Sequence, residues 1–152
     1  MLELDDGSHL SEITAICEYL EEKYPSPPLI GSTPEERAAC RMWTRRVDLN
    51  ICEPLTNSFR FGEALKFFEK RIVCAPEASP GLRRIGTDRL QWLDGQMADG
   101  RAYLCGSRFT LADILLYCFL AFLVSAGYQL DPANTKVAAW LARVGERPSA
   151  KA

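Results

Sequence analysis

An unbroken apolar run over residues 114–124 constrains the fold of this chain more than any other feature. The run is too short to span a bilayer, which needs about 20 residues. A helix that is apolar on all faces belongs at the centre of a bundle, so we expect a buried helix here. Thr110 and Asp113 precede the run with the spacing of a capping box, which satisfies the first N–H groups of a helix. We expect both residues to be structural.

The rest of the chain from Thr33 onward is also helical in pattern. Thr33 and Pro34 predict a helix start, with threonine as the cap and proline at the first helical position. Pro54 should kink or end this helix. Its expected inward residues are Ala38, Ala39, Met42, Trp43 and Val47. A later helix should run over 82–97 and end at Gly100, with inward residues Ile85, Leu90, Leu93 and Met97.

The first residues predict a different unit, a β-hairpin followed by one helix. Residues 2–4 and 8–10 have the pattern of short strands on either side of an Asp-Gly turn. A helix over 12–24 follows, and the prolines at 25–28 end it. Its apolar stripe consists of Ile13, Ile16, Cys17 and Leu20. A hairpin with one helix buries too little surface to be stable alone, so we expect it to need a partner that the sequence does not contain.

Charge and cysteine usage exclude several functional classes. The chain has 18 basic and 20 acidic residues, a net charge of −2, which gives no electrostatic footprint for nucleic acid or an anionic membrane. No pair of cysteines has C-x-x-C spacing and there is one histidine, so we expect no metal site. We expect the six cysteines to be small buried hydrophobes in a reducing cytoplasm. They are Cys17, Cys40, Cys52, Cys74, Cys105 and Cys118.

These elements in this order resemble a cytosolic glutathione S-transferase of bacterial type. The hairpin and first helix are similar to the third and fourth strands and third helix of that family, and the proline-rich segment is similar to its interdomain linker. Residues 109–113 resemble the capping box before its buried sixth helix, and residues 140–148 resemble its closing helix. The resemblance implies a mainly α fold, with a thioredoxin-like α/β first domain and an all-helical second domain.

The resemblance also implies domain boundaries. Residues 1–24 would be a remnant of the thioredoxin-like domain, in the form of two strands and a helix. Residues 25–33 would be the linker, and residues 34–152 the all-α C-terminal domain. The chain would therefore lack most of the first domain.

The position of Met1 decides what the resemblance implies about catalysis. In the family, a cis-proline comes immediately before the strand that Leu2 begins, so Met1 falls just after that position. The Ser, Tyr or Cys that activates the thiol belongs to the first part of the family's fold. The catalytic residue is therefore expected upstream of Met1, and the chain by itself is expected to be inactive in conjugation.

Part of a glutathione site is implied at the start of the first helix. In the family, an acidic residue followed by serine binds the γ-glutamyl end of glutathione, and the helix N-terminus receives its carboxylate. Glu12 fits the acidic position, Ile13 stands where serine is usual, and Ser11 is one residue out of register. The alternative is that Ser11 and Glu12 only cap the helix. His9 is expected to be exposed, without a catalytic role.

The family's second substrate pocket lies against the first long helix of the helical domain. The resemblance implies a hydrophobic electrophile pocket lined by Met42, Arg45, Arg46, Leu49, Phe59 and Phe61, with Arg41 as a further candidate. For the arginines, the alternative is a solvated helix face on which Arg45 lies near Asp48. For the phenylalanines, it is ordinary packing.

Three functions remain open. The first is conjugation of the glutathione thiolate to small electrophiles by an intact, cytoplasmic, homodimeric enzyme, with glutathione as co-substrate and without a metal. The second is a non-catalytic helical module for dimerisation or binding. The third is a helical small-molecule binder unrelated to the transferases.

Overall fold

The computed structural model describes residues 1–151, and most of them are helical. Within these residues, a two-stranded sheet comes first and seven α-helices follow, with one π-helical segment between α2 and α3. The elements are β1 (Leu2–Glu3), β2 (His9–Leu10), α1 (Ile13–Lys23), α2 (Pro34–Val47), the π segment (Asp48–Cys52), α3 (Glu53–Phe61), α4 (Leu65–Phe68), α5 (Ser79–Gln96), α6 (Leu111–Ser125) and α7 (Thr135–Gly145). Short 3₁₀ turns lie at Pro76–Ala78, Met97–Asp99 and Pro148–Ala150.

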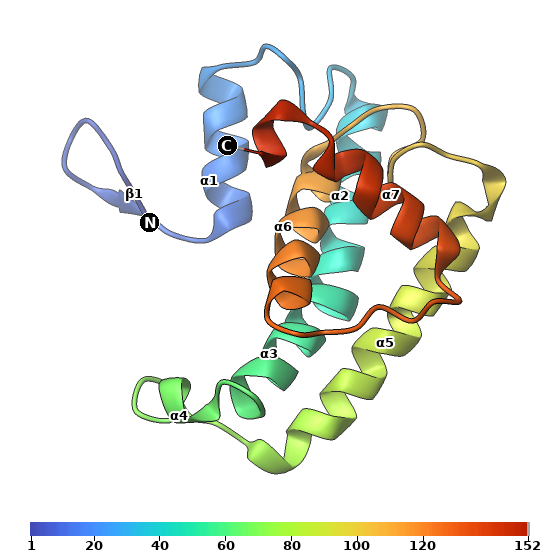
Figure 1. Ribbon diagram of the computed structural model, residues 1–152. Helices are drawn as coiled ribbons and strands as arrows, with labels where there is room; N and C mark the ends of the chain where they lie inside the picture. The colour runs from blue at the N-terminus through green and yellow to red at the C-terminus, as the bar shows by residue number, and fades with distance from the viewer. Residues whose placement is uncertain (152) are drawn as a thin grey trace.

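Helix α6 lies in the middle of the helical part, packed against α2, α3 and α7 (Figure 1). The predicted capping box is present, and the Thr110 N–H donates to Asp113 Oδ2 at 3.0 Å. The Asp113 carboxylate does more than cap, because it also accepts from the Leu104 N–H and from the Trp140 indole N–H, both at 2.9 Å. This one buried carboxylate therefore joins the start of α6 to α7 and to the preceding loop.

The prediction that α6 is buried on all faces is wrong for its second half. Leu115, Leu116 and Leu120 are buried, but the Phe122 side chain is 51% exposed and Val124 is 43% exposed. Cys118 is exposed on the same helix. The reason is that the neighbouring helices cover only part of α6, and the left-hand side in Figure 1 stays open between α1 and α4.

Helices α2 and α3 continue into each other through the π segment, so Pro54 does not end the helix. The wider π turn comes directly before it, and the Glu53 N–H reaches back to the Asp48 carbonyl. An extra residue in a turn accommodates the missing proline donor and the bulk of its ring. Thr33 caps α2 as predicted, accepting from the Glu36 N–H at 3.2 Å.

The predicted inward faces of α2 and α5 are partly wrong. The buried stripe of α2 consists of Cys40, Trp43, Thr44 and Val47. Met42, predicted to face inward, is exposed because it lies beside this stripe. On α5, Leu90 and Leu93 are buried as predicted, as is Met97 just after the helix, whereas the Ile85 side chain is 50% exposed.

The hairpin has the predicted antiparallel pairing, with Leu2 opposite Leu10 and Glu3 opposite His9. Gly7 in its turn has a φ of +80°, a conformation that favours glycine. His9 is exposed as expected. The predicted apolar stripe of the following helix α1 is largely uncovered, since Ile13 is 59% exposed and Leu20 is 37% exposed.

A buried carboxylate attaches α1 to the segment that follows it. The Glu21 side chain accepts from the backbone N–H groups of Leu29, Ile30 and Gly31, at 2.9, 2.6 and 3.3 Å. The Leu29 carbonyl in turn accepts from the Leu111 N–H at 3.0 Å. Residues 29–31 are therefore fixed between α1 and the start of α6.

The six cysteines occupy different environments, and all are free thiols. Cys40 and Cys52 are buried as predicted, and burial raises the pKa of Cys52. Cys17, Cys74 and Cys105 are only partly buried and Cys118 is exposed, so the prediction of six buried cysteines is wrong for these four. Within residues 1–151, no helix combines the length and the hydropathy needed to cross a membrane.

Candidate functional site

The start of α1 has an unusual backbone. Glu12 has a φ of +67°, the one positive φ among the described non-glycine residues. Such a conformation costs on the order of 1–3 kcal/mol and tends to occur at functional sites. No side chain caps this helix, so capping does not explain Ser11 and Glu12. The first N–H groups of α1 are left without a side-chain acceptor, and Ser11, Glu12 and Ile13 are all exposed.

The first residue of the chain lies at the hairpin and not in a cleft. The Met1 side chain is 89% exposed, next to β1. The resemblance placed the thiol-activating residue upstream of Met1, and we assign that role to none of residues 1–151. The location of the catalytic residue therefore stays a prediction.

A cleft of about 270 Å³ lies between α1 and the second half of α2. Its lining residues are Thr14, Glu18, Arg41, Thr44, Arg45 and Asp48. The Arg41 guanidinium donates to both Glu18 carboxylate oxygens, at 3.1 and 3.0 Å. The expected contact between Arg45 and Asp48 is present at 3.7 Å.

Electrostatics connects this cleft to the start of α1. Burial raises the pKa of Asp48, the negative charges of Glu53 and Glu12 raise it further, and Arg45 opposes them. Among residues 1–151, no group of three or more potential ligands could hold a metal ion.

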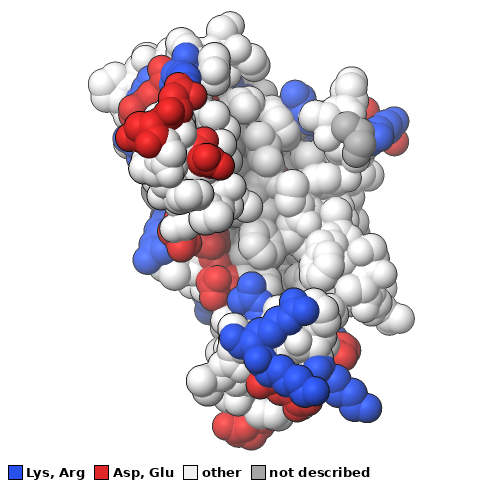
Figure 2. All heavy atoms as spheres, turned by 90° about the vertical axis from the view of Figure 1, so that its left-hand side faces the viewer, with Lys and Arg blue, Asp and Glu red and all other residues white. Residues whose placement is uncertain are grey.

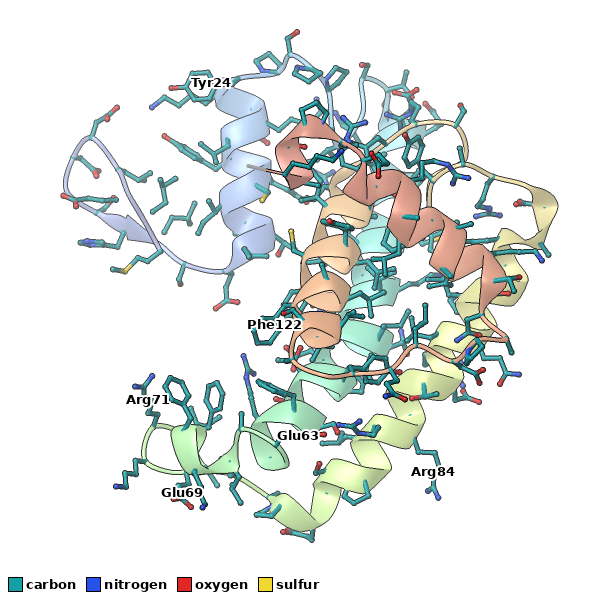
Figure 3. The ribbon with its side chains drawn as sticks, in the orientation of Figure 1. Tyr24, Glu63, Glu69, Arg71, Arg84 and Phe122 are labelled. Atoms are coloured by element: carbon teal, nitrogen blue, oxygen red, sulfur yellow. The ribbon has the colours of Figure 1, made fainter. Side chains whose placement is uncertain are left out.

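The open face of α6 presents an aromatic pair. Phe59 of α3 meets Phe122 of α6 edge to face, with ring centroids 5.4 Å apart. Phe122 points from α6 toward the open left-hand side in Figure 3. Figure 2 shows the same side as a hollowed surface without charged side chains, between an acidic region above and a group of lysines and arginines at the height of α4. This hollow suits an apolar group.

The structure separates the residues that the resemblance implied for one electrophile pocket. Arg45 and Arg41 line the polar cleft. Met42 and Leu49 are exposed outside it, at 43% and 47%. The remaining members are Arg46, whose guanidinium lies 5.2 Å from the Trp43 ring centroid, Phe59, which packs on Phe122, and Phe61, which is half-buried.

Several lining residues were missed from the sequence. Thr14 and Glu18 are one helical turn apart on α1, and Thr44 and Asp48 are one turn apart on α2 and the π segment. The helical period places each pair on one face. Which faces meet depends on how the two helices pack, and the sequence pattern alone does not give that.

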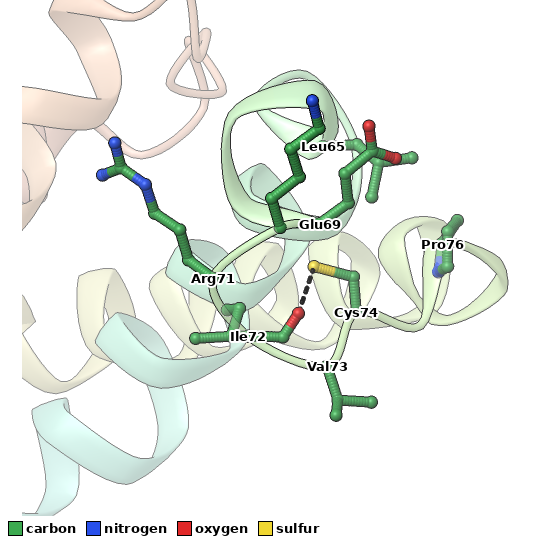
Figure 4. A pocket seen from close by; sticks show the side chains of 8 residues that line it. Leu65, Glu69, Arg71, Ile72, Val73, Cys74 and Pro76 are labelled. Carbon is green, nitrogen blue, oxygen red and sulfur yellow. Dashed lines mark hydrogen bonds between the residues drawn. The ribbon is translucent and has the colours of Figure 1, made fainter.

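A second hollow lies beside α4, with a volume of about 540 Å³. Its lining includes Glu69, Arg71, Ile72 and Cys74. The side chains in Figure 4 point in different directions and do not converge on a common centre, and the Cys74 thiol is held by the Ile72 carbonyl at 3.7 Å. The arrangement offers no set of groups that could hold a ligand, so we place the candidate site at α1, α2 and α6.

Comparison with known proteins gives a family. Residues 88–143 match the family model "Glutathione S-transferase, C-terminal domain". The chain is similar to Gtt2 from Saccharomyces cerevisiae, with a TM-score of 0.89, 30% identity, and coverage of 99% of this chain and 72% of that one. The chain belongs to the glutathione S-transferase family.

The curated relatives agree but are longer. Glutathione S-transferase 2 of Saccharomyces cerevisiae is 30% identical over 99% of this chain, which spans 64% of that relative. Elongation factor 1-gamma of Schizosaccharomyces pombe is 34% identical over 77% of this chain, which spans 27% of that protein. The chain is thus also similar to part of a protein whose name is not that of a transferase.

Proposed function

We propose that this glutathione S-transferase chain binds the γ-glutamyl end of glutathione at the start of α1, within an enzyme that conjugates glutathione to small electrophiles. The observation that carries the proposal is the strained, exposed Glu12 at a helix start that no side chain caps. The γ-glutamyl end carries an ammonium and a carboxylate. The Glu12 carboxylate would accept from the ammonium, and the first N–H groups of α1 would donate to the carboxylate.

Ile13 has no hydroxyl to add to this site, and Ser11 lies one position away from the usual serine. The thiol of glutathione needs a neighbouring hydrogen-bond donor to lower its pKa. We assign no described residue to that role, and we propose that it belongs to a residue preceding Met1 in an intact enzyme. The 152-residue chain by itself would then not catalyse conjugation, although it would retain weak affinity for glutathione.

The electrophile would lie against the hollow face of α6. Phe122 is exposed there and Phe59 supports it from α3. An aromatic pair of this kind favours a small apolar compound. From family membership alone, we also propose a homodimer that acts in the cytoplasm.

A second candidate function is a binding module without catalysis. The similarity to part of elongation factor 1-gamma favours it, because that protein is not named as a transferase. The two functions differ in their requirement for the start of α1. A binding module has no need of a strained Glu12.

Isothermal titration of the chain with glutathione tests the first function. Glu12→Gln keeps the size of the side chain but removes its charge, so we expect an affinity loss of about tenfold. Glu22→Gln is the matched control, since Glu22 is exposed on the same helix and should bind as the wild type does. S-methylglutathione should bind as tightly as glutathione, because no described residue is assigned to the thiol. Equal affinity of Glu12→Gln and the wild type would reject the proposed contact.

A further inference from the structure

The segment around α4 protrudes from the helical part of the molecule and contributes nothing to its core (Figure 1). None of residues 59–85 is buried, α4 included. Local backbone hydrogen bonds define the shape of the segment. The Ala64 N–H donates to the Phe59 carbonyl at 2.9 Å, and the Arg71 N–H donates to the Phe68 carbonyl at 2.8 Å. The protrusion is therefore ordered by its own backbone, and its side chains are free to meet something outside the chain.

Three apolar side chains are exposed on this protrusion. Val73 is 95% exposed, Phe67 is 55% exposed and Ile72 is 43% exposed. In Figure 4 the Val73 side chain points away from α4. Exposed apolar residues that occur singly are normal, but three of them within residues 67–73 form a cluster, and clusters of this kind mark interaction surfaces.

Basic side chains flank the apolar cluster. Lys66, Lys70 and Arg71 are exposed. Within residues 1–151, no carboxylate forms an ion pair with any of the three. The Arg71 guanidinium lies 3.9 Å from the Phe67 ring centroid, so positive charge and apolar surface are adjacent. Glu69 is the acidic residue of this stretch, and in Figure 3 it lies on the opposite side of α4 from Arg71.

The net charge of −2 is unevenly distributed along the chain. Residues 1–24 contain seven acidic residues and one basic residue, whereas residues 60–73 contain four basic and two acidic residues. Glu63, one of these two, is paired with Arg83. Salt screens charges that are more than about 8 Å apart, so the local charge decides what the α4 end attracts. The expectation of no electrostatic footprint for an anionic membrane rested on the net charge alone.

We propose that residues 66–73 are a docking site for an anionic lipid membrane. Phe67, Ile72 and Val73 would enter the headgroup region, and the flanking lysines and arginine would meet the lipid phosphates. This combination suits a membrane surface, because the apolar side chains leave water while the cations pair with anionic headgroups. The acidic region in Figure 2 lies at the other end of the same face and would point away from the membrane. The docked chain would therefore have one preferred orientation.

A membrane fits the α4 surface better than an acidic protein does. An acidic protein surface would pair with Lys66 and Lys70, but it offers no apolar environment to the projecting Val73. A bilayer supplies both the anionic charge and the hydrocarbon. The proposed docking does not involve the start of α1, so it succeeds or fails separately from glutathione binding.

Cosedimentation with lipid vesicles tests the proposal on the full chain. The chain is mixed with vesicles of phosphatidylcholine, with or without phosphatidylserine. We expect binding to the vesicles that contain phosphatidylserine, and release as the salt concentration rises, because salt screens the attraction. No binding to these vesicles, or equal binding to both kinds, would overturn the proposal.

Substitutions at exposed positions locate the binding surface. Lys66→Gln and Lys70→Gln each remove one charge and should each weaken binding about fivefold. Val73→Ser should also weaken binding, because it removes apolar surface without changing the charge. Lys136→Gln is the matched control and should bind as the wild type does, since Lys136 is exposed on α7, which lies apart from α4 in Figure 1. An equal loss in Lys136→Gln and Lys70→Gln would contradict a site at α4.

Immobilised polyglutamate separates a membrane from an acidic protein partner. Circular dichroism first confirms that the variants are folded. Retention of the chain on polyglutamate that is lost in Lys66→Gln and Lys70→Gln, together with no binding to vesicles, would assign the surface to an acidic protein and overturn the proposal. Binding to phosphatidylserine vesicles that weakens in Val73→Ser would support it.

Discussion

Helices α1 and α6 begin in opposite ways. At the start of α6, the buried Asp113 carboxylate accepts from Thr110, Leu104 and Trp140, and every contact is internal. At the start of α1, Glu12 is exposed and strained, and no side chain caps the helix. Both helix starts present N–H groups and a positive dipole end. The same local feature thus stabilises the fold when it is buried and satisfied, and is available to a ligand when it is exposed and unsatisfied.

The largest expected effect is at the α6 start. Asp113→Ala leaves the Leu104 N–H, the Thr110 N–H and the Trp140 indole N–H buried without an acceptor. We expect the free energy of unfolding to fall by about 4 kcal/mol. Urea denaturation followed by tryptophan fluorescence measures it. Asp88→Ala is the control, because Asp88 is exposed and pairs only with its neighbour Arg89, and it should cost less than about 0.5 kcal/mol. Similar losses in the two variants would contradict the central role of Asp113.

The next effect is at the other end of α1. Glu21→Ala removes the acceptor of three backbone N–H groups, those of Leu29, Ile30 and Gly31. We expect a loss of about 3 kcal/mol and faster hydrogen exchange at these three amides. Glu22→Ala is the control, because Glu22 is the next residue of the same helix and is exposed. It should change neither the free energy of unfolding nor the exchange rates of these three amides. Unchanged exchange in Glu21→Ala would show that this carboxylate does not fix the segment.

Thr110→Ala separates the two halves of the capping box at the α6 start. It removes the side-chain hydroxyl while leaving the Asp113 contacts to Leu104 and Trp140. We expect a smaller loss than for Asp113→Ala, about 1 kcal/mol. Thr110→Ser should restore most of the loss, since serine is as good a cap. If Thr110→Ala lowered the free energy of unfolding as much as Asp113→Ala does, the Thr110 hydroxyl and not the Asp113 carboxylate would be the main source of stability at this helix start.

The smallest expected effect is a gain in stability, whereas the preceding variants lose stability. Glu12→Gly relieves the positive φ, so we expect the chain to become more stable by about 0.5 kcal/mol while glutathione binding weakens. Thermal unfolding and titration calorimetry on the same sample measure both. A variant that is less stable than the wild type would mean that Glu12 contributes structurally.

Local patterns predicted much of this fold. The capping box of Thr110 and Asp113, the Thr33 cap and the hairpin with its Asp-Gly turn depend on residues within a few positions of each other, which a sequence displays directly. The contacts of Asp113 with Trp140 and of Glu21 with Ile30 were not predicted, because they depend on how separate elements pack. The same limit applies to the cleft, where the lining residues of α1 and α2 come together only after the two helices are placed.

Predictions of burial from the apolar stripe of a helix were wrong where no other element covers that stripe. Met42 and Ile85 were expected inside and are exposed, and the second half of α6 has an uncovered face at Phe122. Apolar periodicity identifies a face that favours burial. It does not show whether another element covers that face.

An NMR titration with glutathione compares the two helix starts in a single experiment. Backbone amide shifts are followed as glutathione is added to the labelled chain. We predict dose-dependent shifts in the first turn of α1, at Ile13 and Thr14, that disappear in Glu12→Gln. We predict no shifts in the first turn of α6, at Leu111 and Ala112. Shifts at α6 with none at α1 would contradict the assignment of one helix start to the fold and the other to the ligand.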